Sequence, residues 1–390
     1  MQAVVLAAGE GKRLRPLTKN RPKVMIPVGN KPILEYIIDS LAQVGIRDIV
    51  MVVGYREDSI ISYFGDGSRW GVSIRYAKQS KRLGTAHALY QAKDYVKGNF
   101  LILPGDNIID SLTIKDIVDK EINTILATYS DITSKYGSVI EDKGKIRVVE
   151  KKRGDEGGLI FTGIAKLSTD IFEIIKESMK NELYDLPDIL NELENLKISI
   201  TKGLWMDAIY PWDLLRLNFT VLRNIPRSVS GTVASANIIG NVYVGDGTKI
   251  GSGVFIKGPA YIGENCVIGE NSVIMPGTCV GDNVTIGAFS YLENSIIMKG
   301  SSLGKYSLIQ NSIIGEGCSV GDRFTSLTGR FQKIINCEII HRENFGVVMG
   351  DDCKIGAMVT TAPGILIGNN AKIKGMKYIT EDICEEESVV

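Results

Sequence analysis

Val244 to Leu292 read VGDGTKIGSGVFIKGPAYIGENCVIGENSVIMPGTCVGDNVTIGAFSYL, and every sixth residue of this stretch is aliphatic. The aliphatic positions are Val244, Ile250, Ile256, Ile262, Ile268, Ile274, Val280, Ile286 and Leu292. A period of six does not follow one face of an α-helix, where neighbours are about three or four residues apart. A repeat this long and regular indicates a parallel β-helix, in which each hexad forms one side of a coil.

The fourth residue after each aliphatic position is mostly small. These residues are Thr248, Val254, Ala260, Cys266, Ser272, Thr278, Val284 and Ser290. Three hexads per coil predict a triangular prism, with the aliphatic side chain pointing inward and the small one filling a corner. The register slips by one residue after Leu292 and again after Ile309, and the pattern continues at Ile297, Leu303, Ile314, Val320, Met349, Ile355, Ile367 and Ile373.

The first 225 residues follow a different pattern. Short apolar runs at Ala3–Ala7, Asp48–Val53 and Phe100–Leu103 predict buried strands. Between the first two runs, apolar residues recur at helical spacing, at Ile33, Leu34, Ile37, Ile38, Leu41 and Val44, before a C-cap candidate, Gly45. This order predicts a parallel sheet with right-handed crossovers. We expect an α/β, Rossmann-like domain over residues 1–225 and an all-β parallel β-helix over residues 236–380.

Composition excludes several partners. Lys plus Arg equals Asp plus Glu, at 45 each, so no overall field attracts nucleic acid or an anionic membrane. Nowhere do eighteen apolar residues run together, and the first residues, MQAVVLAAGEGKR, lack a basic leader. The six cysteines all follow residue 265 and form no C-x-x-C pair, so we expect scattered buried thiols rather than a zinc site. These features favour a cytoplasmic protein.

The segment LAAGEGKRLRPLTKNRPKVMIPVGNKPILEY, residues 6–36, carries the chemistry. It follows a predicted strand and precedes a predicted helix, where backbone N–H groups favour bound phosphate. Gly9 and Gly11 allow a triphosphate to approach closely, and Arg13 and Lys23 supply cations for the charge on the phosphates. A dinucleotide-binding fingerprint needs Gly or Ala where Leu14 stands, and a Walker loop needs Ser or Thr after Gly-Lys.

This segment resembles the signature of the sugar-1-phosphate nucleotidylyltransferase family, which includes glucose-1-phosphate thymidylyltransferases and N-acetylglucosamine-1-phosphate uridylyltransferases. The whole chain is similar to archaeal members with a C-terminal left-handed β-helix of hexapeptide repeats. The resemblance implies catalytic roles for Arg13 and Lys23, and a homo-oligomer (a trimer or a multiple of one) formed through the β-helix. It also implies a set of nucleotide-binding residues: Leu6, Ala7, Ala8, Gly9 and Gly11.

A second segment resembles the family's nucleobase-binding loop. Gln79 precedes the sequence Leu-Gly-Thr-Ala-His-Ala, in which the resemblance makes Gly84 and Thr85 nucleotide-binding residues. A glutamine side chain offers both a donor and an acceptor, which suits the imide edge of uracil or thymine. We therefore expect UTP or dTTP as the nucleotide.

Two aspartates match the family's metal ligands. Asp106 lies in Leu-Pro-Gly-Asp-Asn, just after the third predicted strand, and Asp207 lies in Gly-Leu-Trp-Met-Asp. The resemblance makes both side chains ligands of Mg²⁺, which prefers a few carboxylates and keeps water and phosphate oxygens as its other ligands.

The expected sugar-phosphate residues depart further from the family pattern. Gly137, Glu150, Lys151 and Thr162 occupy positions that resemble its sugar-phosphate loops. However, Lys152 replaces the usual proline after Glu-Lys, so the sugar stays open between glucose-1-phosphate and N-acetylglucosamine-1-phosphate.

The implied reaction is in-line attack of a sugar-1-phosphate oxygen on the α-phosphorus of the nucleotide, with release of pyrophosphate. Two alternatives remain: a bifunctional enzyme that is also an acetyl-CoA-dependent acetyltransferase, and a non-catalytic sugar-nucleotide-binding regulatory subunit. Acetyl transfer to an amine needs a general base. In bifunctional relatives this base is normally a histidine, and Lys305 stands where the resemblance would put it. Of the chain's two histidines, His87 lies in the nucleobase loop and His341 lies beyond the regular hexads.

Overall fold

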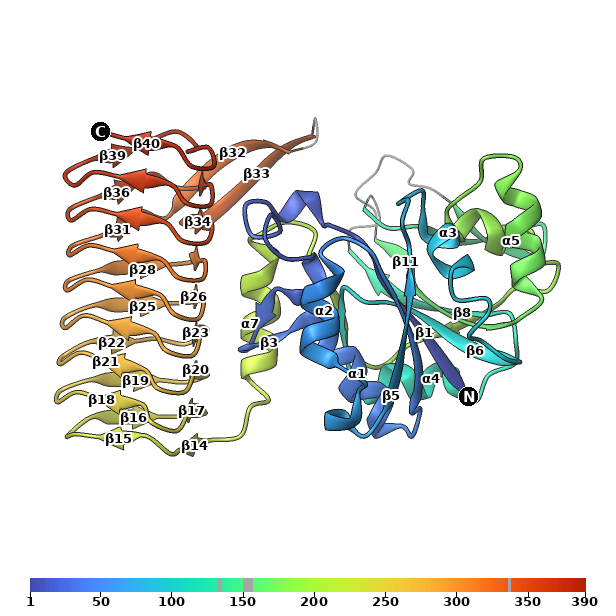
Figure 1. Cartoon of the computed structure of the whole chain (residues 1–390), viewed down its shortest axis with the longest axis horizontal. Helices are drawn as coiled ribbons and strands as arrows, with labels where there is room; N and C mark the ends of the chain where they lie inside the picture. The colour runs from blue at the N-terminus through green and yellow to red at the C-terminus, as the bar shows by residue number, and fades with distance from the viewer. Residues whose placement is uncertain (132–134, 150–156, 336–337) are drawn as a thin grey trace. The chain divides into compact units, whose positions relative to one another are not determined.

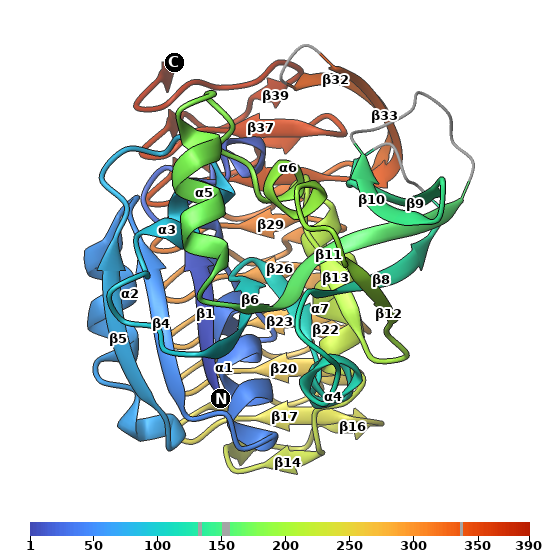
Figure 2. The same cartoon turned by 90° about the vertical axis from the view of Figure 1, so that its right-hand side faces the viewer.

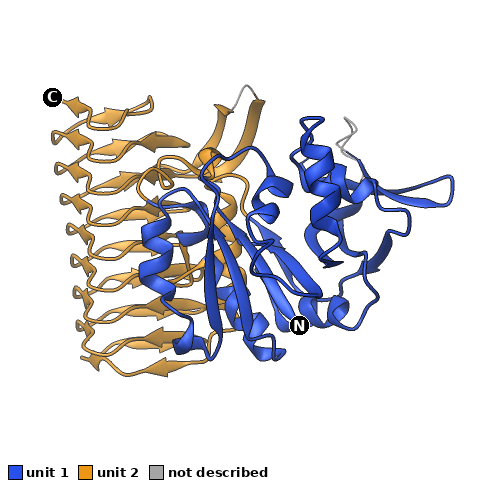
Figure 3. Cartoon of the chain, turned by 45° about the vertical axis from the view of Figure 1, so that its right-hand side comes forward, with its two compact units in different colours: residues 1–10, 21–25, 33–207 blue, residues 11–20, 26–32, 208–390 orange. Residues whose placement is uncertain are grey.

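The computed structural model covers the whole chain and describes all residues except 132–134, 150–156 and 336–337 (Figure 1). The described residues divide into two compact units (Figure 3). Unit 1 holds residues 1–10, 21–25 and 33–207, and unit 2 holds residues 11–20, 26–32 and 208–390. Two short N-terminal segments therefore group with the C-terminal half of the chain.

A mixed β-sheet forms the centre of unit 1 (Figure 2). Its first strands are parallel, with β1 (Gln2–Ala7) between β4 (Asp48–Val53) and β6 (Asn99–Pro104), and β5 (Ser73–Lys78) beside β4. This part confirms the parallel sheet predicted from the three apolar runs. The other strands are β8 (Thr124–Ser130), β9 (Ser138–Asp142), β10 (Lys145–Val149), β11 (Gly158–Ser168) and β12 (Lys197–Ile200). β11 pairs antiparallel with β6, an arrangement that the sequence pattern does not predict.

Helices cover the sheet on both faces. Val4 belongs to one buried hydrophobic cluster and Val5 to another, so alternate residues of β1 face opposite layers. The helices of unit 1 are α1 (Ile33–Gln43), α2 (Glu57–Phe64), α3 (Thr85–Tyr90), α4 (Ser111–Val118), α5 (Ile171–Met179) and α6 (Leu186–Asn191), with short 3₁₀ turns η2 (Lys23–Met25) and η3 (Ser68–Trp70). Gly45 follows α1 with a φ of 83°, as expected for a glycine that ends a helix.

Unit 2 contains the β-helix (Figure 1). In the described part of the chain, its strands form three parallel sheets. The first holds β14 (Ser228–Val229), β17 (Val242–Val244), β20 (Ala260–Ile262), β23 (Thr278–Val280), β26 (Ile296–Ile297), β29 (Ile313–Ile314), β34 (Val347–Met349) and β37 (Ile365–Ile367). The second holds β15 (Thr232–Val233), β18 (Lys249–Ile250), β21 (Val267–Ile268), β24 (Thr285–Ile286), β27 (Ser302–Leu303), β30 (Ser319–Val320), β35 (Lys354–Ile355), β38 (Lys372–Ile373) and β40 (Ser388–Val389). The third holds β16 (Asn237–Ile239), β19 (Phe255–Lys257), β22 (Val273–Ile274), β25 (Tyr291–Glu293), β28 (Leu308–Gln310), β31 (Thr325–Ser326), β36 (Thr360–Thr361) and β39 (Tyr378–Ile379).

The inside of the prism confirms the hexad pattern. Every aliphatic position named from the sequence is buried, and so are the small residues four places later. The hydroxyl of Thr248 shows how a corner is satisfied: it donates to the Gly263 carbonyl at 2.7 Å and accepts from the Cys266 N–H at 2.9 Å. Thr248 therefore fills its corner and also bonds the neighbouring coil, whereas the buried Thr278 hydroxyl has no hydrogen-bond partner among the described residues. The sequence repeat predicts a left-handed β-helix, and the stacked parallel sheets agree with it.

The slips of register lie in turns. Ile274 pairs with Leu292, eighteen residues later, whereas Leu292 pairs with Ile309, seventeen residues later. The shorter coil loses one residue between β25 and β26, and the strands themselves stay in line. The longest break lies between β31 and β34, where an antiparallel hairpin of β32 (Gly329–Ile335) and β33 (Glu338–Phe345) interrupts the coils.

The rest of unit 2 comes from short elements. They are η1 (Lys12–Leu14), β2 (Pro27–Val28), β3 (Lys31–Pro32) and α7 (Asp213–Leu222). Asn218 of α7 accepts from the Gly29 N–H at 3.0 Å and donates to the Gly277 carbonyl at 2.8 Å. This one buried side chain joins the β2–β3 turn, the helix and a coil of the β-helix.

The cysteines are free and mostly buried, as expected from the sequence. Cys266, Cys279, Cys318 and Cys353 are buried, and burial raises the pKa of the Cys279 thiol to about 12. The expectation is wrong for Cys384, which is exposed because it lies in the last, incompletely covered coil. Cys337 lies outside the described residues. No helix in the described ranges is long and apolar enough to cross a membrane.

Neighbouring residues of β21 allow a matched test of the prism core. Ile268 is 1% exposed and stacks on Ile250 and Ile286, whereas Val267 is 44% exposed. We expect Ile268→Ala to lower the free energy of unfolding by about 2–5 kcal/mol, because it leaves a cavity. Val267→Ala should cost below about 1 kcal/mol. Urea denaturation followed by circular dichroism measures both, and equal losses would contradict the inward orientation of Ile268.

Candidate active site

Two carboxylates from distant parts of the chain meet in unit 1. Asp106 follows β6 and precedes β7 (Asn107–Ile109), and Asp207 ends β13 (Trp205–Asp207). β13 pairs antiparallel with β7, which sets Asp207 opposite Asn107. This pairing brings Asp106 and Asp207 to the same edge of the central sheet, where parallel sheets commonly bind ligands.

Lys23 joins these two carboxylates. Its Nζ lies 2.7 Å from Asp106 Oδ2 and 2.5 Å from Asp207 Oδ1. The residue is 8% exposed, and burial alone would lower the pKa of its ammonium group. The charges of Asp106 and Asp207 and their hydrogen bonds outweigh this effect and raise the pKa. Lys23 is therefore a permanent buried cation between two anions.

The arrangement fits a divalent cation that prefers oxygen ligands. Asp106 and Asp207 already converge on one positive group, so they can share a cation. Asn107, which the sequence reasoning missed, has a buried Oδ1 without a hydrogen-bond partner in the described structure. Two carboxylates that converge at one point suit Mg²⁺, which keeps water or phosphate oxygens as its other ligands.

The segment predicted to bind phosphate begins where β1 ends. The Leu6 carbonyl accepts from the Gly105 N–H at 2.8 Å, and the Ala8 carbonyl accepts from the Tyr55 N–H at 3.1 Å, so the segment is fixed to its neighbours. A side chain at Gly9 would meet no atom of the protein within 4 Å. The open space beside Gly9 leaves its backbone accessible to a ligand. Ala7 is buried in the core.

A loop of residues 11–20 follows and belongs to unit 2. Its base is closed by the Lys23 N–H, which donates to the Glu10 carbonyl at 3.2 Å. Gly11 has a φ of 77°, in the left-handed region that favours glycine. Arg13 is exposed on the 3₁₀ turn η1. The two predicted catalytic cations, Arg13 and Lys23, therefore belong to different compact units.

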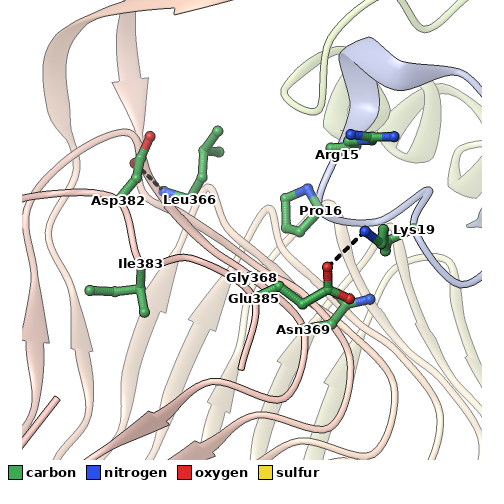
Figure 4. Close-up of a pocket in the computed structure, with 9 residues that line it drawn as sticks. All are labelled: Arg15, Pro16, Lys19, Leu366, Gly368, Asn369, Asp382, Ile383 and Glu385. Carbon is green, nitrogen blue, oxygen red and sulfur yellow. Dashed lines mark hydrogen bonds and ion pairs between the residues drawn. The ribbon is translucent and has the colours of Figure 1, made fainter. Parts of the chain in front are cut away.

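Contacts within unit 2 hold this loop. Figure 4 shows Arg15, Pro16 and Lys19 facing residues of the last coils of the β-helix across a pocket. Lys19 pairs with Glu385 at 2.9 Å across it. Asn20, next to the pocket, donates to Asp351 at 3.3 Å.

Tyr210 links the segment after Asp207 to the hairpin, a contact that the sequence pattern does not reveal. Its hydroxyl donates to Glu338 Oε2 at 2.9 Å, and its ring stacks on Trp212 at 5.1 Å. Burial, together with the bond to Glu338, raises the pKa of Tyr210 to about 12, and the nearby charge of Arg13 opposes this shift. The hairpin of the β-helix thus contacts a residue that is electrostatically coupled to Arg13.

The predicted nucleobase residues lie together at the start of α3. Gln79 is buried, and its Nε2 donates to the Gly84 carbonyl at 3.1 Å and lies 3.0 Å from His87 Nδ1. The Oε1 of Gln79 has no partner in the described part of the structure. Burial lowers the pKa of His87, which favours the neutral ring.

Thr85 and Gly84 pack against the segment before α6. The Thr85 hydroxyl lies 3.2 Å from Asp185 Oδ1 and accepts from the Leu186 N–H at 2.7 Å. A side chain at Gly84 would meet the Tyr184 carbonyl oxygen at 2.4 Å. Gly84 is therefore needed for close packing of the loop.

The sugar-phosphate candidates are partly described. The Gly137 carbonyl accepts from the Phe161 N–H at 2.8 Å, next to Thr162. Thr162 is buried, and its hydroxyl donates to the Leu126 carbonyl at 2.7 Å. Its own carbonyl accepts from Trp205 Nε1 at 3.2 Å, which places β11 beside the strand that carries Asp207. Glu150 and Lys151 lie outside the described residues.

The candidate residues for acetyl transfer do not form a comparable site. Lys305 is exposed, and its N–H donates to Asp322 at 2.8 Å within a turn of the β-helix. His341 is exposed on β33, opposite Gln332 in the hairpin.

Comparisons with known proteins cover both halves of the chain. Residues 2–221 match the nucleotidyl transferase family, residues 256–330 match the GMPPB C-terminal domain, and residues 346–380 match the hexapeptide repeat of succinyl-transferase. The bifunctional protein GlmU of Methanococcus vannielii is 36% identical and aligns with 100% of this chain and 97% of its own length.

Two further relatives match mainly the N-terminal half. The UTP–glucose-1-phosphate uridylyltransferase AglF of Haloferax volcanii is 36% identical over 54% of this chain and 87% of its own length. A solved structure from Bacillus anthracis, assigned as a glucose-1-phosphate thymidylyltransferase, superposes with a TM-score of 0.52 at 29% identity. It covers 58% of this chain and 97% of its own.

The nucleotidyl transferase match spans more than half of the chain, the full-length relative aligns from end to end, and the C-terminal half carries hexapeptide repeats. This protein belongs to the sugar-1-phosphate nucleotidyltransferase family.

Proposed function

We propose that the protein transfers a nucleotidyl group from dTTP or UTP to glucose-1-phosphate or N-acetylglucosamine-1-phosphate, with Mg²⁺ held by Asp106 and Asp207. The observation that carries this proposal is the convergence of both carboxylates on Lys23 at the carboxyl edge of the sheet. Nucleotidyl transfer to a sugar-1-phosphate is the activity of the family. Our proposal goes beyond the family activity in naming the nucleotide as dTTP or UTP and the acceptor as glucose-1-phosphate or N-acetylglucosamine-1-phosphate.

The cations and the backbone would act on the phosphates. Gly9 and Gly11 leave room for the triphosphate, while Arg13 and Lys23 stabilise the negative charge that shifts onto pyrophosphate as it departs. Mg²⁺, when bound, supplies further charge neutralisation of the phosphates. The attacking sugar phosphate is already ionised near neutral pH, so the reaction needs no general base.

The Gln79 side chain would recognise the nucleobase of the nucleotide. Because Nε2 is engaged by Gly84 and His87, the free Oε1 is the atom available to a ligand. An acceptor at this point suits the imide N–H of uracil or thymine. Thr85, whose hydroxyl bonds the Asp185 side chain, would line the same nucleobase site.

Sugar binding would involve Gly137, Glu150, Lys151 and Thr162. For Thr162 we propose a supporting role, because its hydroxyl already bonds the Leu126 carbonyl and its carbonyl orients Trp205. The ring of Trp205 meets Tyr136 edge to face at 5.3 Å, so these two aromatic side chains are further candidates for contacts with the sugar.

We further propose that residues 1–225 supply the catalytic domain and that the β-helix, residues 236–380, joins copies into a homo-oligomer, a trimer or a multiple of one. The name of the Methanococcus relative indicates a second activity in that protein. Here Lys305 takes the place of the expected base, and we propose that nucleotidyl transfer is the single activity.

Replacing Asp106 tests the metal assignment. We expect Asp106→Ala to lower Mg²⁺-dependent pyrophosphate release about a thousandfold or more, because a shared ligand of the phosphate-bound cation is lost. Asp119→Asn, an exposed carboxylate at the end of α4, serves as the control and should keep full activity. Activity of the Asp106→Ala protein within a few fold of the parent would remove Asp106 from the mechanism.

Replacing Gln79 tests whether its side chain recognises the nucleobase. We expect Gln79→Leu to reduce kcat/KM for UTP and dTTP by about tenfold or more, since the imide N–H loses its acceptor. Activity with ATP and GTP should change little. The measurement is kcat/KM for each of the four nucleotides with both sugar phosphates. A parent enzyme that prefers a purine nucleotide would overturn the assignment of Gln79.

An acetyl-transfer assay tests the assignment of a single activity. We expect no consumption of acetyl-CoA with glucosamine-1-phosphate as acceptor, and no effect of His341→Ala on pyrophosphate release. Acetyl-CoA consumption that disappears in His341→Ala or Lys305→Ala would instead establish a second active site on the β-helix.

A further inference from the structure

Unit 2 contains a hollow with a volume of about 470 Å³. Its walls are α7, β33 and the turns of the β-helix that carry Asn294 and Asn311. We call it the α7 hollow. It contains no residue of the phosphate-binding segment, the nucleobase loop or the carboxylate pair.

The charges that line the α7 hollow are mainly positive. Arg216 of α7 and Arg342 of β33 form no ion pair with any residue that the structure describes. The acidic residue of the lining, Glu343, already pairs with Arg330 at 2.7 Å. Two guanidinium groups are therefore left to bind an anion.

The amide groups of the lining add donors. Asn311 accepts from Asn294 Nδ2 at 2.7 Å through its Oδ1, which leaves its own NH₂ group available. The side chain of Asn344 makes no hydrogen bond within the described ranges. The Thr220 hydroxyl donates to the Arg216 carbonyl at 3.0 Å and is already satisfied. The hollow therefore offers more donors than acceptors, which is the chemistry that a phosphate group requires.

Aromatic side chains form the remaining wall. The guanidinium of Arg342 lies over the Trp212 ring, 5.7 Å from its centroid, and Phe345 meets the same ring edge to face at 5.9 Å. Phe219 is 37% exposed at the hollow. The buried Nε1 of Trp212 has no hydrogen-bond partner in the described structure. These rings supply an apolar surface beside the cations.

We propose that the α7 hollow is a binding site for a phosphorylated ligand that carries a ring. The phosphate group binds Arg216 and Arg342, because planar guanidinium groups match phosphate oxygens in charge and geometry. The ring packs on Phe219, the exposed aromatic side chain of the lining. The lining shares no residue with the site proposed for nucleotidyl transfer, so its occupancy should not depend on turnover.

Phenyl phosphate is a minimal probe for this site, because it combines one phosphate and one ring. Trp212 lies in the hollow, so equilibrium binding can be followed by its fluorescence in the full chain with Trp70→Phe and Trp205→Phe as the common background. We expect saturable binding in the low millimolar range, as for other ligands of this size. Phenol and inorganic phosphate should each bind at least about tenfold more weakly, because each lacks one half of the recognised group.

Variants distinguish the hollow from other sites. The double variant Arg216→Gln, Arg342→Gln should weaken phenyl phosphate binding at least about tenfold. Arg227→Gln, an exposed arginine outside the hollow, should bind like the parent. Lys23→Gln should also bind normally, even if nucleotidyl transfer is lost, so the result is independent of the proposed function.

Two outcomes overturn the proposal. One is a parent protein with no saturable binding of phenyl phosphate up to about 10 mM. The other is a double variant that binds as tightly as the parent while its circular dichroism spectrum shows an unchanged fold. Equal loss in Lys23→Gln would place the probe at the nucleotide site and count against the hollow as well.

Discussion

The ion pairs of the buried Lys23 ammonium group are the interaction on which the arrangement of the candidate active site in unit 1 depends. Asp106 and Asp207 are about a hundred positions apart in sequence, and their carboxylates would repel each other at this separation without a cation between them. Lys23 supplies that cation, and its own N–H closes the phosphate-binding loop on the Glu10 carbonyl. The backbone of Lys23 thus fixes the loop, and the side chain of Lys23 fixes the carboxylate pair. A hydrophobic replacement would remove the cation that separates these two partly buried carboxylates.

The two predicted catalytic cations of the N-terminal segment, Lys23 and Arg13, belong to different compact units. Lys23 groups with the central sheet, whereas Arg13 groups with the β-helix, α7 and the hairpin. The Tyr210–Glu338 bond and the Lys19–Glu385 pair show that the β-helix contacts the elements around Arg13 directly. The β-helix therefore also helps to hold the loop that carries Arg13. It supplies part of the packing around a residue that the family signature assigns to catalysis.

Much of this architecture could be predicted from the sequence because it rests on short-range periodicity. A hexad repeat fixes which side chains face inward, and the buried positions from Val244 to Ile373 follow it. The strand limits of β4 agree with the apolar run Asp48–Val53 for the same reason. Contacts between distant residues could not be predicted in this way. Nothing in the sequence pairs Tyr210 with Glu338 or aligns β11 antiparallel to β6, because such contacts depend on tertiary packing and leave no local pattern.

The hexad repeat also limits where the β-helix can carry chemistry. Its interior positions stack coil on coil, and even a corner hydroxyl such as that of Thr248 is used in bonds between coils. A charged side chain inside would be unsatisfied, so charged side chains lie in turns, in insertions and at outward-facing strand positions such as Lys249 and Lys354. The hairpin between β31 and β34 is the longest such insertion in the described chain, and it carries Glu338, His341 and Arg342. It lies outside the stacked coils, so its exposed residues are not tied to the hexad pattern. The Glu338 partner of Tyr210 and one wall of the α7 hollow come from this insertion, where the repeat no longer constrains the sequence.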